Sequence, residues 1–137
     1  MRLVLTALIV IAGLFDLLLG IGFFLDPVNS SARFFLRPDG MGGLAVLRAD
    51  MTAFFVVAAV WMIWGAWKRN GDLLLVPAAL FGIAFAGRLL SAVADGTYPQ
   101  FWLPMSVEAL HVALLLWARQ VLPHHSIEQM SGDEVAG

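Results

Sequence analysis

Long apolar runs separated by short polar connections dominate the chain. Each run is close to the ~20 residues that a helix needs to cross about 30 Å of hydrocarbon. None alternates apolar and polar residues with a period of two, as the strands of a membrane barrel would. The pattern therefore predicts an all-α fold, a bundle of four transmembrane helices within a single domain, residues 1–122. The four helices are expected at about residues 3–25, 44–67, 73–94 and 105–122.

The connection between the first two runs, residues 26–43, is too polar to cross a membrane. Within it, Ser30 and Ser31 can cap a short helix that carries two arginines and two phenylalanines over residues 33–37. We expect this amphipathic helix to lie at the outer membrane interface. At the other end of the chain, residues 123–137 form a polar tail, which we expect to be disordered.

The composition agrees with a chain dissolved in lipid. Hydrophobic residues make up 61% of the sequence and the mean hydropathy is +0.86, whereas soluble domains average roughly 45–50% apolar residues. The net charge of −2 offers no basic surface for nucleic acid. The absence of cysteine excludes disulfides, thiolate metal sites and cysteine nucleophiles.

Basic residues in the short flanks of the runs predict the orientation. Arg2, Lys68, Arg69 and Arg119 flank one side of the membrane, and the 33–37 segment supplies two arginines to the other side. Because lysine and arginine are enriched in cytoplasmic loops, we expect both termini in the cytoplasm.

Ionisable residues inside the apolar runs are the strongest functional signal. A charge in hydrocarbon costs at least ~2.5–3.5 kcal/mol, so such residues face a bundle interior and mark functional sites by default. At about 1.5 Å per helical residue, all of them fall in the outer half of the membrane, with Asp95 at its rim. The predicted charged layer comprises Asp16, Arg48, Asp50, Arg88, Ser91, Asp95, Glu108 and His111.

Helical spacing groups some of these residues on common faces. Arg88, Ser91 and Asp95 are spaced i, i+3, i+7 and share one face, and Glu108 and His111 share another. In contrast, two residues that are two positions apart on a helix point in different directions. At most one member of the pair formed by residues 48 and 50 can therefore face the centre of a bundle.

The charges of the predicted layer do not balance. Two arginines oppose four carboxyls, which leaves −2 if every group is ionised. Since buried carboxylates without a partner take up protons, one or two of the carboxyls are protonated, water-exposed or bound to a cation. Asp16 is the deepest of them.

The chain offers little support for an enzyme. Glu108 and His111 have the Glu-x-x-His spacing of di-iron bundles, but those sites need a second such motif and two further glutamates. The sequence contains no nucleophile elbow, phosphate loop or dinucleotide fingerprint. We therefore name no catalytic residue, metal or cofactor, and rank a metal-dependent enzyme last.

An ordered set of short motifs resembles a known family. Arg48-Ala49-Asp50, Gly87-Arg88-x-x-Ser91, Asp95-Gly96 and Glu108 are similar to the pattern of an uncharacterised bacterial family of small four-helix membrane proteins, domain of unknown function 4345. The resemblance covers nearly the whole chain to about residue 122 and implies a multi-pass protein of the bacterial inner membrane. It implies no reaction. The architecture is also similar to the DoxX-like four-helix families.

Two functions follow as hypotheses. In the first, the charged layer binds a small amphipathic ligand such as a lipid or a quinone, or relays protons; Arg48 and Arg88 hold an anionic or carbonyl group, and Asp50 and Glu108 orient them. In the second, the protein is a structural or accessory subunit whose ion pairs only fix helix packing, and whose partner is another membrane protein or a second copy.

Overall fold

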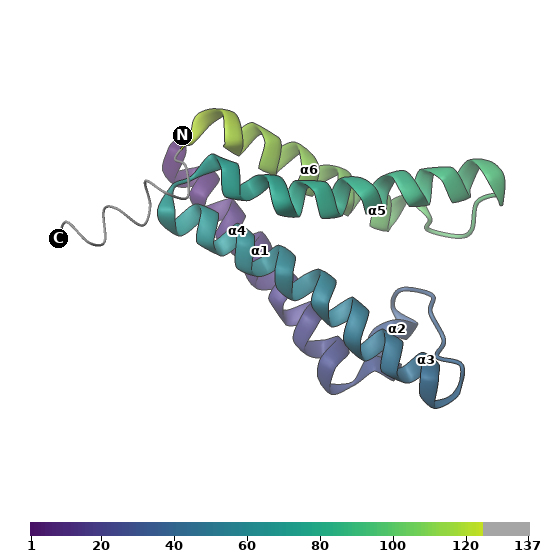
Figure 1. Ribbon diagram of the computed structural model, residues 1–137. Helices are drawn as coiled ribbons and strands as arrows, with labels where there is room; N and C mark the ends of the chain where they lie inside the picture. The colour runs from purple at the N-terminus through teal and green to yellow at the C-terminus, as the bar shows by residue number, and fades with distance from the viewer. Residues whose placement is uncertain (125–137) are drawn as a thin grey trace.

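The computed structural model describes residues 1–124, which form helices and no strand. The long helices lie in two antiparallel pairs (Figure 1). One pair consists of α1 (Arg2–Leu25) and α4 (Thr52–Lys68), and the other of α5 (Leu75–Ala94) and α6 (Trp102–Val121). The predicted all-α class is confirmed, and each predicted run contains a long helix.

The two pairs meet at one end of the molecule and diverge towards the other (Figure 1). The joined end contains the N-terminus, the α4–α5 connection and the end of α6, and the opposite end is the open end. The hydrophobic core lies towards the joined end and draws on all four long helices. Its buried members are Ile9, Ala58, Met62, Ala66, Leu74, Ala78, Phe81, Leu115, Ala118 and Leu122.

Tight turns close the joined end. Arg69 has a left-handed conformation with φ of 50° and ends α4. The Asn70 side chain then caps the short 3₁₀ helix η2 (Gly71–Leu74) by accepting a hydrogen bond from the Asp72 amide at 3.0 Å. The Gly71 amide donates to the Pro123 carbonyl at 2.8 Å, which fastens the end of the last helix to this connection.

At the open end, α1 is followed by the short helix α2 (Pro27–Ala32). Asp26 caps it by accepting from the Asn29 side chain at 2.6 Å and from the Asn29 amide at 3.2 Å, and these hydrogen bonds lower the pKa of the Asp26 carboxyl. A short helix thus follows α1 as expected, but it covers Pro27–Ala32 and not residues 33–37, because Asp26-Pro27 starts it earlier. The chain then turns at Phe35, which has φ of 60°.

The second predicted run is longer than expected and contains an irregular turn. It begins at Gly40 with α3 (Gly40–Val46), continues through the π-helix η1 (Leu47–Met51) and merges into α4. The π-helical turn spans the Arg48-Ala49-Asp50 motif. Such turns are rare and occur frequently at functional sites.

Three helical segments are long and apolar enough to cross a membrane: Arg2–Leu25, Gly40–Lys68 and Gly71–Ala94. This finding supports a membrane protein. The fourth predicted span, α6, is not among them, because Glu108, His111 and Arg119 lower its mean hydropathy. Of the predicted tail 123–137, residues 125–137 lie outside the described part of the chain.

Candidate functional site

A partly buried ion pair joins α5 to α6. Arg88 donates from Nε to Glu108 Oε1 at 2.7 Å, within the range of a strong charge-assisted hydrogen bond. The Glu108 side chain is 9% exposed and that of Arg88 is 33% exposed. The glutamate is therefore enclosed, whereas the guanidinium reaches the surface of the helix pair.

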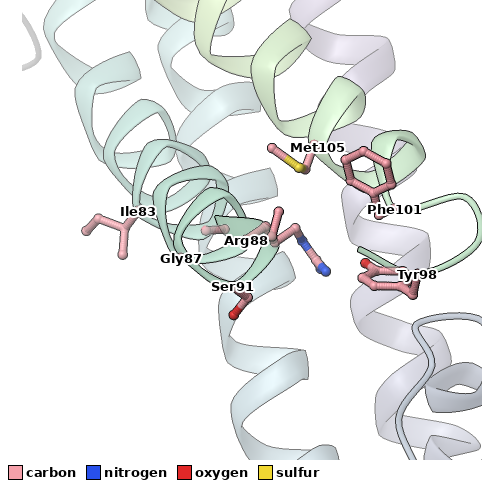
Figure 2. A pocket seen from close by; sticks show the side chains of 9 residues that line it. Ile83, Gly87, Arg88, Ser91, Tyr98, Phe101 and Met105 are labelled. Carbon is pink, nitrogen blue, oxygen red and sulfur yellow. The ribbon is translucent and has the colours of Figure 1, made fainter. Parts of the chain in front are cut away.

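The exposed side of Arg88 faces a groove between α5, the connection after it and the start of α6. The groove has a volume of about 390 Å³. Figure 2 shows the guanidinium extending towards Tyr98, with Ser91 one turn away along α5. Within residues 1–124, the terminal guanidinium nitrogens form no hydrogen bond to another residue. The groove is lined by Ile83, Ala84, Gly87, Arg88, Ser91, Ala92, Tyr98, Phe101 and Met105.

A second polar pair links the two helix pairs. His111 Nε2 of α6 lies 3.4 Å from Asp16 Oδ2 of α1, and the His111 Nδ1 atom lies 2.8 Å from the Val107 carbonyl oxygen. Because a carbonyl oxygen only accepts, Nδ1 carries a hydrogen. Without a further proton, Nε2 and Oδ2 would both be acceptors and would repel each other, so one of the two atoms must carry a proton. We infer that the pair holds one proton and is neutral overall.

An aromatic ring packs against the histidine of this second pair. The Phe81 ring centroid lies 4.2 Å from that of His111, and the Phe54 ring packs edge-on against Phe81 at 5.5 Å. Asp16 is 1% exposed and His111 8%. Since both side chains are almost fully buried, charges on them interact in a low-dielectric environment, where an uncompensated charge is costly.

The other predicted site residues lie outside this cluster. Arg48, Asp50, Ser91 and Asp95 are exposed, because the two helix pairs diverge at the open end. Only Ser91 among these four lines the groove. The structure thus joins Arg88 to Glu108 in a partly buried contact and Asp16 to His111 in a buried one. The rest of the predicted layer lies at the surface.

Two of the exposed motifs have local structural roles. Arg48 donates from Nε to the Phe24 carbonyl at 3.0 Å, which ties η1 to the end of α1. Gly96, with φ of 102°, ends α5 directly after Asp95. A glycine in this conformation is a common helix terminator, so the Asp95-Gly96 motif needs no ligand to explain it.

Sequence reasoning did not select the aromatic wall of the groove. Tyr98 and Phe101 belong to the connection between α5 and α6, and their rings lie 6.4 Å apart. Tyr98 also packs edge-on against Phe35 of the α2–α3 connection at 5.2 Å, so it contacts the other helix pair at the open end. A tyrosine within a polar connection gives no periodic signal, although it is the only tyrosine of the chain.

Within residues 1–124, no group of three or more histidine, aspartate or glutamate side chains has an arrangement that could hold a metal ion. Comparisons with protein-family models, with curated proteins and with solved structures return no match to this chain.

Proposed function

We propose that the protein binds a small amphipathic membrane ligand, a lipid or a quinone, in the groove beside Arg88. The observation that carries this proposal is the asymmetric engagement of the Arg88 guanidinium. Its Nε is held by buried Glu108 at 2.7 Å, while its outer side faces an apolar groove of about 390 Å³. Glu108 orients the arginine, and the free donors receive an anionic or carbonyl oxygen of the ligand.

The size and chemistry of the groove support this function. Ligand sites in proteins have volumes of roughly 300–1,000 Å³ and combine apolar walls with a few placed polar groups. Here Ile83, Phe101 and Met105 supply apolar surface, and Tyr98 and Arg88 supply hydrogen-bond donors. An amphipathic molecule would place its polar group at the guanidinium and its apolar part along α5 and α6.

The proposal includes α6 as a fourth membrane span. Its charged and polar groups Glu108 and His111 are buried against other helices, so its outer surface consists mostly of apolar side chains such as Leu110 and Leu116. A 20-residue helix covers about 30 Å at 1.5 Å per residue. Burial of the charges thus offsets the low mean hydropathy that separates α6 from the other candidate spans.

We further propose that the joined end faces the cytoplasm of a bacterial cell, with the chain in the inner membrane. Arg2, Lys68, Arg69 and Arg119 gather at this end, as the positive-inside rule favours. The resemblance to the domain of unknown function 4345 family remains part of this proposal. Its support is that Gly87, Arg88 and Ser91, three residues of the shared motif, all line the groove.

Native mass spectrometry of the protein purified in mild detergent tests the ligand. We expect a bound lipid or quinone that the Arg88→Gln variant loses, because the amide carries no charge and fewer donors. Arg48→Gln is the matched control: it removes an exposed arginine that bonds the Phe24 carbonyl away from the groove, and it should retain the ligand. Equal retention by both variants would overturn the proposal.

The alternative is a structural or accessory subunit with a membrane-protein partner or a second copy of the chain. One observation favours it: the Arg88–Glu108 contact already joins α5 to α6 without a ligand. Polar contacts in membranes contribute little on average, about 0.6 kcal/mol in one measured system. Unfolding of Arg88→Gln together with no bound amphiphile in the parent protein would favour this alternative.

A further inference from the structure

Three buried polar side-chain atoms of α1 and α6 have no hydrogen-bond partner in the described chain. They are Asp16 Oδ2, Glu108 Oε2 and His111 Nε2. Their side chains are 1%, 9% and 10% exposed, respectively. The large majority of buried side-chain polar atoms have a hydrogen-bond partner. The single proton inferred for the Asp16–His111 pair serves Oδ2 and Nε2, which leaves Glu108 Oε2 as the bare atom of the cluster.

The buried charges balance before any ligand binds. Arg88 neutralises Glu108 through Oε1, and Asp16 with His111 forms a pair that holds one proton and has no net charge. The cluster is therefore neutral, although the whole predicted layer carries −2. An anion that binds the outer side of Arg88 would compete for the arginine's charge and leave the enclosed Glu108 carboxylate, 9% exposed, without full compensation, with a total charge of −1. A net charge in such an environment is costly, and a carboxylate next to an added negative charge gains affinity for a proton.

We propose that, when an anionic headgroup binds at Arg88, the Glu108–His111–Asp16 cluster takes up one proton from solvent. This inference rests on the proposed function and adds to it a coupling between ligand binding and proton uptake. Glu108 is the first acceptor, because its Oε2 is bare and can take a proton while Oε1 stays with Arg88. The proton bonds to Oε2 on binding and returns to solvent when the ligand leaves, so no other reactant is needed. His111 and Asp16 provide a second acceptor one turn along α6.

The surrounding charged groups do not supply the missing positive charge. From α5 the cluster meets Arg88 alone, and from α1 it meets Asp16. From α4, the partner of α1, it meets no charged group but only the Phe54 ring, which packs on Phe81. The charged residues of η1, Arg48 and Asp50, are exposed, and Lys68 lies at the joined end. A proton is therefore the nearest available compensation for a bound anion.

Isothermal titration calorimetry measures both binding and proton uptake. Short-chain dihexanoyl phosphatidylglycerol would be titrated into the whole protein in dodecyl maltoside micelles, in two buffers of different ionisation enthalpy. Dihexanoyl phosphatidylcholine, whose headgroup carries no net charge, and the Arg88→Gln variant report non-specific partitioning. We expect uptake of about one proton per bound phosphatidylglycerol. Because one proton is linked, the affinity should fall as the pH rises, by up to about tenfold per pH unit over the range in which the proton is taken up.

Glu108→Gln isolates the acceptor. The amide can still accept from Arg88 but cannot take up a proton. The affinity of this variant for the anionic lipid should therefore lose most of its pH dependence. The two possible failures are distinguishable. Binding by the parent protein with no proton uptake in either buffer would overturn this inference alone. No binding of the anionic lipid above the phosphatidylcholine control would overturn the anion site at Arg88 on which the inference rests.

Discussion

The two helix pairs use glycine in opposite ways. In the α1–α4 pair, a methyl group added at Gly13 would lie 2.9 Å from Ile63 Cγ1, and one added at Gly20 would lie 2.8 Å from Val56 Cγ2. In the α5–α6 pair, a methyl group added at Gly87 would meet nothing within 4 Å. The first pair therefore uses small residues to bring backbones together, whereas the second uses one to leave the groove open.

Their polar contacts differ in the same sense. The α1–α4 side has side-chain hydrogen bonds to backbone carbonyls of the neighbouring helix, such as Thr52 Oγ1 to the Gly20 carbonyl at 3.3 Å. The α5–α6 side has an ion pair with a half-exposed arginine, Arg88 with Glu108. Close packing and satisfied backbone groups are typical of a structural unit. An incompletely satisfied charge beside a groove is typical of a site.

The largest effect should come from the contact that links the two pairs. Substituting His111→Leu removes the partner of Asp16 and leaves its carboxyl buried alone. Removing one member of a buried polar pair costs about 3–5 kcal/mol of unfolding free energy in soluble proteins. We expect a loss towards the lower figure in detergent micelles, measured by titration with a denaturing detergent.

The double variant Asp16→Leu/His111→Leu is the control for this prediction. It removes both polar groups and restores apolar contacts, so much of the lost stability should return. A double variant no more stable than His111→Leu would show that the cost comes from lost packing around Phe81 rather than from an unpaired carboxyl.

A matched pair of leucine substitutions compares the two helix pairs directly. Gly13→Leu forces side-chain atoms into Ile63 and towards the Ala59 carbonyl, which should cost about 1–3 kcal/mol through overpacking. Gly87→Leu projects into open space, so its unfolding free energy should change by only about 0.5 kcal/mol, while the groove is filled and ligand binding falls. Unfolding in denaturing detergent and native mass spectrometry measure the two effects.

Equal destabilisation by the two leucine variants would contradict the contrast between the pairs. It would mean that α5 and α6 pack more closely around residue 87 than the structure indicates. Retained ligand binding by a stable Gly87→Leu variant would instead move the ligand away from this groove.

The positions of the helices could be predicted from the sequence, because apolar runs of spanning length leave few alternatives. Glu108 and His111 were placed on one helical face from their spacing alone, and both are buried. The π-helical turn at Arg48 could not be predicted. No residue pattern announces an i→i+5 turn, and it changes the directions of the side chains around it.

The membership of the buried cluster was harder to predict, since depth along a helix does not determine burial. Arg48 and Asp50 belong to the motif that resembles a family, yet they are exposed because the helix pairs diverge there. Asp16 and His111 lie outside that motif and are buried, because α1 and α6 contact each other nearer the joined end. Which helices pair, and where they separate, is tertiary information that hydropathy and helical phase do not contain.

The smallest predicted effect reverses its sign between the two pairs. Gly87→Ala should stabilise the protein by about 0.5–1 kcal/mol, because alanine loses less backbone entropy in a helix and its methyl group meets no atom within 4 Å. Gly13→Ala should destabilise it, because the same methyl group lies 2.9 Å from Ile63 and 3.3 Å from the Ala59 carbonyl oxygen. One methyl group at each site, measured by unfolding in the same micelles, tests whether packing or helix propensity decides the outcome. Shifts of the same sign at both positions would show that the two glycines do not differ in the way the structure places them.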